Sequence, residues 1–266
     1  LTPGAGQVLV KTLACGICGS DLHALHHMEH MIETSRRAGG GGGGAMGGGF
    51  DPTADTVFGH EFCAEILEHG PGTTGLLKPG TRVVSVPATI TGTGVELLGY
   101  SNNLPGGFAE RMILSEMMLL EVKNGLPTDQ ATLTEPFAVG AHAVAKARLD
   151  KDSVSLVIGC GPVGLAVIAG LKAKGHGPVI AADYSPRRRA AAEMLGADVV
   201  IDPASESPHA RWEAFGVPTA RAAQSMARMM GKTFGQPVVF ECVGSPGILQ
   251  HMIEASAKGG YDFMLG

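Results

Sequence analysis

A glycine fingerprint in the second half of the sequence constrains the fold more than any other feature. Five mostly apolar residues, Val154–Ile158, lead into the segment GCGPVG at 159–164, and an apolar helical segment follows directly. In such a strand–turn–helix setting the first glycine permits the tight turn, the second lets a pyrophosphate approach the backbone, and the third lets helix and strand pack closely. The helix N-terminus offers free N–H groups to the phosphates. The loop residues that we predict to contact a dinucleotide are Gly159, Gly161, Pro162, Val163 and Gly164.

Two later strand ends carry residues suited to the same coenzyme. The next strand ends at Asp183, nineteen residues after Gly164. A carboxylate there can hold both ribose hydroxyls of NAD and would repel the 2′-phosphate of NADP. Arg188 could accommodate such a phosphate, but the acid at the strand end is the stronger indicator, so we predict NAD rather than NADP. A further strand leads to Val243 and Gly244, where the carboxyl end of a parallel strand would face the coenzyme.

The order of predicted elements indicates an α/β protein of two domains, 1–147 and 148–266. Strands and helices alternate after Ser153, which implies parallel strands with helical crossovers. The first part is β-rich and punctuated by glycine and proline, until a helical pattern begins at Ala131. The strands predicted before that helix are Gln7–Leu13, Glu61–His69, Arg82–Pro87 and Phe108–Leu114. The later strands are Val154–Ile158, Pro178–Ala182, Val199–Ile201 and Pro237–Cys242, with helices at Val163–Lys174, Arg187–Leu195, Ala220–Met230 and Gly247–Ala257.

Charge, hydropathy and cysteine content exclude several classes of function. The formal net charge is −5, and no basic stripe of the kind that phosphate backbones need is present, so nucleic acid is not an expected partner. The longest apolar runs, such as Val163–Leu171, are too short to span a membrane, and no signal peptide opens the sequence. We therefore expect a cytoplasmic protein. Five cysteines favour metal or redox chemistry over a disulfide framework.

Two segments do not fit regular elements. Glycine fills nine of the eleven positions of Gly39–Gly49, and we interpret this run as a surface loop, a linker rather than a substrate lid. The segment Pro203–Gln236 is longer than an ordinary crossover. We interpret it as an insertion, with a subunit contact around Trp212 as the alternative.

Cysteine, histidine and glutamate in the first domain form a candidate metal site. Cys18, His60 and Glu61 offer a thiolate, an imidazole and a carboxylate, which are the ligand types of zinc. Three protein ligands with one open position are typical of catalytic zinc. Cys15 and Cys18 also form a C-x-x-C pair, but a structural zinc ribbon needs a second pair, and a redox dithiol would need a different setting.

Taken together, these motifs resemble the medium-chain zinc-dependent alcohol and polyol dehydrogenase superfamily, in particular its sorbitol and threonine dehydrogenase branch. The resemblance rests on CGICGSDLH at 15–23, GHE at 59–61, GGFAE at 106–110 and the glycine fingerprint, in that order along nearly the whole chain. It implies a GroES-like β-rich catalytic domain and a Rossmann coenzyme domain with a doubly wound parallel sheet. It also implies one zinc ion in the cleft between them.

The resemblance assigns the metal ligands residue by residue. It implies Cys18 and His60 as ligands and places Glu135 at the third position. Glu61 is the alternative ligand, which in such enzymes can exchange with Glu135 and water.

Three further residues receive roles from the same resemblance. Asp21 would accept the second ring N–H of His60, as carboxylates do behind metal-bound imidazoles. Ser20 would take the proton of the alcohol and pass it through the coenzyme ribose to His23 and solvent, while hydride moves to the nicotinamide. Glu61 is the third residue that we expect to take part in catalysis, together with Ser20 and His23. Ser20 as a helix N-cap and His23 as a surface residue are compatible alternatives.

Departures from the family pattern set further expectations. Ser85–Gly107 contains no cysteine, so we expect no structural zinc. The usual first strand is missing and the sequence stops after Gly266, so we expect an incomplete coenzyme domain. The expected substrate is a small alcohol or carbonyl compound, and the expected assembly is a homodimer or homotetramer. Two alternatives remain open: a zinc-free quinone or enoyl reductase of the same fold, and a non-catalytic binding or lens-type structural relative.

Overall fold

The computed structural model describes residues 1–37, 50–231, 235–245, 247–250, 252 and 262–265. The chain divides into two units, Leu1–Glu135 and Pro136–Gly266. The glycine run Gly39–Gly49 and most of the predicted helix Gly247–Ala257 lie outside the described residues. Within the described part of the chain, no helix combines the length and the apolar character that crossing a membrane requires.

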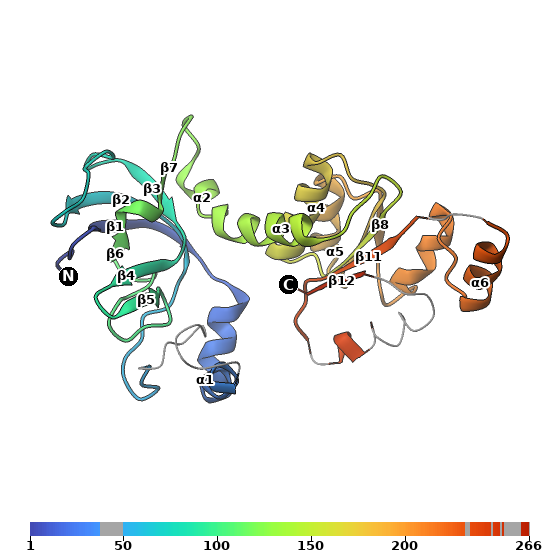
Figure 1. The fold of residues 1–266 in the computed structure, drawn as a ribbon, viewed down its shortest axis with the longest axis horizontal. Helices are drawn as coiled ribbons and strands as arrows, with labels where there is room; N and C mark the ends of the chain where they lie inside the picture. Colours follow the sequence, from blue (N-terminus) through green and yellow to red (C-terminus); the bar gives the residue numbers. More distant parts are fainter. Residues whose placement is uncertain (38–49, 232–234, 246, 251, 253–261, 266) are drawn as a thin grey trace. The chain divides into compact units, whose positions relative to one another are not determined.

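A five-stranded antiparallel sheet in the order β6-β1-β2-β3-β7 organises the first unit (Figure 1). Apolar residues alternate along its strands, as at Phe62, Ala64 and Ile66, so that one face of each strand packs into a shared core. The strands are β1 (Gln7–Gly16), β2 (Glu61–His69), β3 (Arg82–Ser85), β6 (Arg111–Ser115) and β7 (Leu119–Glu121). A hairpin of β4 (Ala88–Thr91) and β5 (Gly94–Leu97) lies against β6, and the short elements η1 (Glu116–Met118) and α2 (Thr128–Ala131) complete the unit.

Helix α1 (Gly19–Arg37) begins one residue before Ser20, so Ser20 lies inside the helix and is not its N-cap; the sequence analysis did not predict how far this helix extends. Its backbone leaves helical geometry at His27, where φ is −136° and ψ is 32°. The residues of α1 that pack into a small apolar cluster with Tyr100 are Ala24 before this kink and Met28, Met31 and Ile32 after it. Burial of this apolar stripe anchors the helical segments on both sides of the kink.

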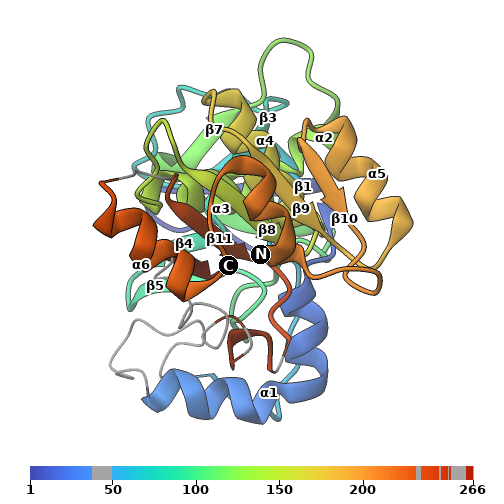
Figure 2. The same ribbon diagram turned by 90° about the vertical axis from the view of Figure 1, so that its right-hand side faces the viewer.

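The second unit is a parallel sheet in the order β10-β9-β8-β11-β12, covered on both faces. Its strands are β8 (Val154–Ile158), β9 (Val179–Ala182), β10 (Val199–Ile201), β11 (Pro237–Glu241) and β12 (Asp262–Leu265). The helices α4 (Pro162–Ala173) and α5 (Pro186–Met194) follow β8 and β9, and Figure 2 shows α5 beside β10. Numbered within the unit, the strand order is 3-2-1-4-5, the order of a doubly wound dinucleotide-binding fold. The predicted fold class is confirmed.

Two features of this unit go beyond the sequence analysis. Strand β12 pairs in parallel with β11, and no prediction had been made for the residues after Gly260. The segment between β10 and β11 contains η2 (Pro208–Phe215) and α6 (Arg221–Met229). Trp212 in η2 is fully buried against Leu156 and Ile180 of the sheet. A subunit contact through Trp212 is therefore wrong, because this side chain is part of its own unit's core.

Helix α3 (Thr134–Lys146) accounts for the difference between the observed division after Glu135 and the predicted boundary after 147. The helix packs on α4 without room for a side chain: a Cβ added at Gly140 would lie 2.6 Å from the Cβ of Ala166. Val144 of the same helix is buried in the core cluster that contains Val167 and Leu171. Its packing therefore places α3 with the parallel sheet.

Because of the α3–α4 contact, we expect two glycine-to-alanine substitutions to change the stability of the protein in opposite directions. Gly140→Ala should destabilise the protein by about 1–3 kcal/mol, because the new methyl group overpacks the contact with Ala166. Gly170→Ala on α4 should instead be neutral or stabilise by up to about 1 kcal/mol, because its Cβ would meet Val144 at an ordinary 3.5 Å and alanine favours the helix. Urea unfolding of both variants measures this difference; equal effects would contradict the tight packing of α3.

Candidate functional site

Pairing of β1 with β2 creates the candidate metal site. The strands are antiparallel, with Gly16 opposite Glu61 and Cys15 opposite Phe62, so the end of β1 meets the beginning of β2. Cys18 follows β1, while His60 and Glu61 stand at the start of β2. Residues more than forty positions apart in the sequence are thereby held at one end of the sheet.

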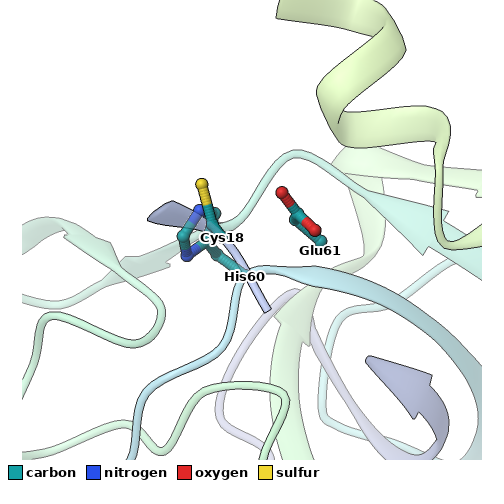
Figure 3. A group of neighbouring side chains, drawn as sticks. All are labelled: Cys18, His60 and Glu61. Carbon is teal, nitrogen blue, oxygen red and sulfur yellow. The ribbon is translucent and has the colours of Figure 1, made fainter. Parts of the chain in front are cut away.

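Cys18, His60 and Glu61 form the one group of three or more possible metal ligands found among the described residues. One ligand atom from each lies within 4.8 Å of the others, and His60 and Glu61 are buried. Figure 3 shows the Cys18 sulfur beside the His60 ring, with the Glu61 carboxylate next to them. Thiolate, imidazole and carboxylate are together a donor set that suits zinc, so these residues fit the predicted ion.

Asp21 lies behind His60, as the sequence predicts. Its Oδ1 is 3.2 Å from His60 Nδ1, and its Oδ2 accepts a hydrogen bond from the backbone N–H of Cys18. The Asp21 side chain is only 3% exposed. One buried carboxylate therefore connects both predicted ligands, and it leaves Nε2 as the His60 nitrogen available to a metal ion.

The GGFAE segment holds the backbone just before His60. Gly106 N–H donates to Val57, Gly107 N–H to Gly59 and Phe108 N–H to Phe58, all through carbonyl oxygens 2.7–3.0 Å away. A Cβ at Gly106 would collide with the Gly59 carbonyl oxygen, and one at Gly107 would lie 2.5 Å from Cys15 Sγ. The two glycines of this segment are thus required for its close approach to the strand that carries His60.

The electrostatic surroundings of His60 favour a bound proton when no metal is present. Burial by itself lowers the pKa of His60, but the hydrogen bond with Cys18 and the charges of Asp21, Cys18 and Glu135 outweigh it and raise the pKa from 6.5 to about 9. A metal ion at Nε2 would have to replace that proton.

Glu135 lies near this group but outside the ligand cluster. It stands in the first turn of α3. Burial raises its pKa, the nearby His60 lowers it, and the charges of Glu61 and Asp21 raise it further. Of the two predicted carboxylate ligands, Glu61 is thus the one within reach of Cys18 and His60 in this structure, while Glu135 interacts with the site through its charge.

Tyr100 is a site residue that the sequence analysis missed. Its hydroxyl donates a hydrogen bond of 2.8 Å to Ser20 Oγ, and Ser20 Oγ lies 3.5 Å from His60 Nε2. The Tyr100 ring is 5.7 Å from the His60 ring, centroid to centroid. Burial raises the pKa of Tyr100 to about 12, so its hydroxyl remains a donor. No motif marks Tyr100, because its position depends on the β4–β5 hairpin before it.

Two further residues from the sequence analysis, Cys15 and His23, lie in the same unit. Cys15, the other cysteine of the C-x-x-C pair, is not in the ligand cluster. Burial raises the pKa of its thiol to about 11. His23 is exposed on α1, one turn after Ser20.

The glycine fingerprint forms the turn between β8 and α4. Gly159 has a φ of +89°, where a side chain would be strained. A Cβ at Gly164 would collide with the Gly159 carbonyl oxygen, whereas one at Gly161 would meet nothing within 4 Å. The open space at the second glycine fits a pyrophosphate approaching the backbone, and Pro162 and Val163 begin the helix behind it.

Asp183 stands at the end of β9 and ties this turn to the next one. Its Oδ2 accepts from Cys160 N–H at 2.8 Å and its Oδ1 from Ser185 N–H at 2.7 Å. Arg188 Nη1 lies 3.8 Å from Asp183 Oδ2. A carboxylate has further lone pairs, so Asp183 can still accept hydrogen bonds from hydroxyl groups.

Glu241 at the end of β11 is a second residue that the sequence analysis missed. Its Oε1 accepts from the N–H groups of Val243 at 2.7 Å and Gly244 at 3.0 Å. The Val243 side chain lies against Gly159, since a Cβ there would be 2.6 Å from it. The predicted coenzyme residues Val243 and Gly244 are thus held beside the fingerprint, between β8 and β11, where the strand order reverses. The sequence signal that could have pointed to Glu241 is an acidic residue shortly before the glycine, Gly244, that follows the strand.

Comparisons with known proteins agree with both units. The alcohol dehydrogenase GroES-like domain matches residues 4–124, and the zinc-binding dehydrogenase domain matches residues 162–266. The (R,R)-butanediol dehydrogenase of Bacillus subtilis (strain 168) is 33% identical over 263 residues, covering 96% of this chain and 68% of that protein. The sorbitol dehydrogenase of the same organism is 28% identical over 266 residues, covering 96% and 66%.

A solved structure extends the comparison to the fold. A zinc-binding dehydrogenase from Sinorhizobium meliloti 1021, determined with NADP bound, matches with a TM-score of 0.74 over 100% of this chain and 70% of that chain. At 24% identity this likeness shows the fold alone. The chain spans about two thirds of the length of the two curated relatives, with 68% and 66% of each covered.

The surroundings of His60 predict a measurable titration. In the metal-free protein the His60 ring should titrate near pH 9. Cys18→Ala should move the midpoint to lower pH, because it removes the sulfur whose hydrogen bond and charge raise the pKa. Cys15→Ala should leave it in place. NMR titration of the imidazole resonances measures all three, and an unchanged midpoint in Cys18→Ala would contradict the Cys18–His60 interaction.

Proposed function

Because the chain belongs to the zinc-binding dehydrogenase family with an alcohol dehydrogenase GroES-like domain, we propose that it oxidises an alcohol or polyol reversibly to the carbonyl compound. NAD accepts the hydride in this proposal, and a zinc ion is held by Cys18, His60 and a glutamate. The observation that carries the proposal is the buried group Cys18, His60 and Glu61, with Asp21 behind His60.

The donor set supports zinc with Glu61 as the ligand in this arrangement and Glu135 as the residue that exchanges with it. A bound zinc ion supplies Lewis acidity that lowers the pKa of an alcohol, and a bound nicotinamide supplies the hydride acceptor. Asp21, whose Oδ1 lies 3.2 Å from His60 Nδ1, orients the His60 ring so that Nε2 is the nitrogen left for the metal ion.

Ser20 and His23 remove the proton that the alcohol loses. Ser20 Oγ lies 3.5 Å from His60 Nε2, which supports a role for its hydroxyl beside the bound alcohol. Tyr100 donates to Ser20, so the Ser20 proton is directed away from Tyr100 and the oxygen is held in position. His23, exposed one helical turn later, accepts the proton and releases it to solvent.

The fingerprint turn and Asp183 bind the coenzyme. The open backbone at Gly161 receives the pyrophosphate, and the start of α4 offers its free N–H groups. Asp183 accepts hydrogen bonds from the ribose hydroxyls, which favours NAD over NADP. Arg188 is the residue that could reverse this preference, by accommodating the 2′-phosphate of NADP. Glu241 keeps Val243 and Gly244 in place beside the turn.

Three expectations from the sequence stay predictions: a single zinc ion per chain, a cytoplasmic location, and assembly as a homodimer or homotetramer. A zinc-free quinone or enoyl reductase has no need for the Cys18–His60 pair, so metal analysis separates it from this proposal. Lack of turnover with alcohols, polyols and amino alcohols would favour the non-catalytic alternative.

The two cysteines of the C-x-x-C pair test the metal assignment. Cys18→Ser should lose zinc and reduce turnover by at least about a hundredfold, while coenzyme binding remains measurable, because the second unit is unchanged. Cys15→Ser is the matched control and should keep both zinc and turnover, because Cys15 is not in the ligand group. Metal quantification and NADH absorbance measure these effects, and turnover by a zinc-free Cys18→Ser protein would refute the proposal.

Asp183 tests the coenzyme assignment. Asp183→Gly should weaken binding of NAD more than that of NADP, because it removes the acceptor for the ribose hydroxyls and the charge that repels a 2′-phosphate. Loss of the hydrogen bond to Cys160 should weaken both coenzymes, so the measured quantity is the ratio of their dissociation constants. Fluorescence titration gives this ratio, and no change in it would overturn the preference for NAD.

A further inference from the structure

Helix α1 carries four histidines that the proposed reaction does not explain. They are His23, His26, His27 and His30, and the backbone leaves helical geometry at His27. All four are exposed, while Ala24 and Ile32 of α1 are buried. The four histidines therefore form a solvent-facing row along α1.

Two of the four rings are placed as a bidentate pair. The centroids of His23 and His27 are 4.9 Å apart, with planes tilted by 47°. A metal ion with bonds of about 2.0 Å to one nitrogen of each imidazole holds such centroids about 4.5–5.2 Å apart. His26 is 6.4 Å from His27 and in an edge orientation, which is too far for the same arrangement. The departure from helical geometry at His27 accompanies this pairing.

We propose that His23 and His27 form a second, reversible site for a divalent transition-metal ion such as Ni²⁺, Cu²⁺ or Zn²⁺. Imidazole suits all three ions, and water completes the coordination. The site is separate from Cys18, His60 and Glu61, shares no ligand with them and is open to solvent. Two ligands on one helix hold the ion more tightly than either alone, because the second imidazole binds at a high effective concentration.

Occupancy of this site inhibits the enzyme. A neutral imidazole has one acceptor nitrogen, and the other carries a hydrogen. A metal ion on the acceptor nitrogen of His23 leaves the ring unable to take up a proton. This consequence rests on the proposed function, in which His23 delivers the proton of the alcohol to solvent. Metal binding itself does not depend on that function.

The binding test uses the zinc-loaded protein titrated with NiCl₂ in a calorimeter. We expect one Ni²⁺ per chain in the unmodified protein and a dissociation constant at least about tenfold higher in His27→Ala, because one of two ligands is lost. The matched controls are His26→Ala and His30→Ala, which remove the same side chain from the same row and should retain binding. Equal weakening in all three variants would overturn the proposal, since it would indicate diffuse binding along the row. Retained binding in His27→Ala would also overturn it.

The turnover test separates the new site from the proposed function. Ni²⁺ at saturating concentration should lower kcat in the unmodified protein by at least about tenfold, with little change in KM for the alcohol. His27→Ala should keep its basal turnover and resist the same Ni²⁺ concentration. Binding without inhibition would leave the metal site in place and refute His23 as the proton acceptor. Equal inhibition of His27→Ala would refute inhibition through this site.

Discussion

The pairing of β1 with β2 is the constraint on which the candidate metal site depends. Gly16 lies opposite Glu61, and the Glu61 carboxylate occupies the space where a side chain on Gly16 would be. A shift of one residue in this register would turn Glu61 to the other face of the sheet and separate it from His60. The register is specified by the alternating core residues of β2, and two irregularities, with one extra residue in β2 at Leu67 and one in β1 at Leu13, adjust the pairing locally. Core packing of one sheet thus determines which three donors meet.

Proton and metal ion are alternatives at this site. Cys18, Glu61, Asp21 and Glu135 surround a single imidazole, and several of these groups are buried. Burial raises the pKa of Glu135, the nearby His60 lowers it, and the charges of Glu61 and Asp21 raise it further. Burial lowers the pKa of His60, but the hydrogen bond with Cys18 and the charges of Asp21, Cys18 and Glu135 raise it to about 9. In the proposed function a divalent cation held by these donors takes the place of the proton on His60.

Motifs with a strict backbone requirement could be predicted from the sequence, and residues placed by tertiary packing could not. The positions of the fingerprint glycines, of Asp183 at a strand end and of Asp21 next to His60 could be predicted, because each depends on a local turn or on one strand pairing; their roles stay predictions. Tyr100 could not be found, since its hydrogen bond to Ser20 crosses eighty residues and depends on the hairpin before it. The length of α1 was missed because its apolar stripe is interleaved with four exposed histidines that obscure the amphipathic pattern.

Acidic residues at strand ends act on the coenzyme unit through the backbone. Asp183 accepts hydrogen bonds from backbone N–H groups of the fingerprint turn and of the turn after β9. Glu241 accepts hydrogen bonds from backbone N–H groups of the loop after β11. Each carboxylate therefore shapes a loop at the reversal of strand order before any ligand is present. For Asp183 this structural duty coincides with the proposed recognition of ribose. A substitution at this position removes two backbone hydrogen bonds, so keeping the affinity for either coenzyme requires compensation in the neighbouring turn, where Arg188 and Ser185 are the adjacent groups.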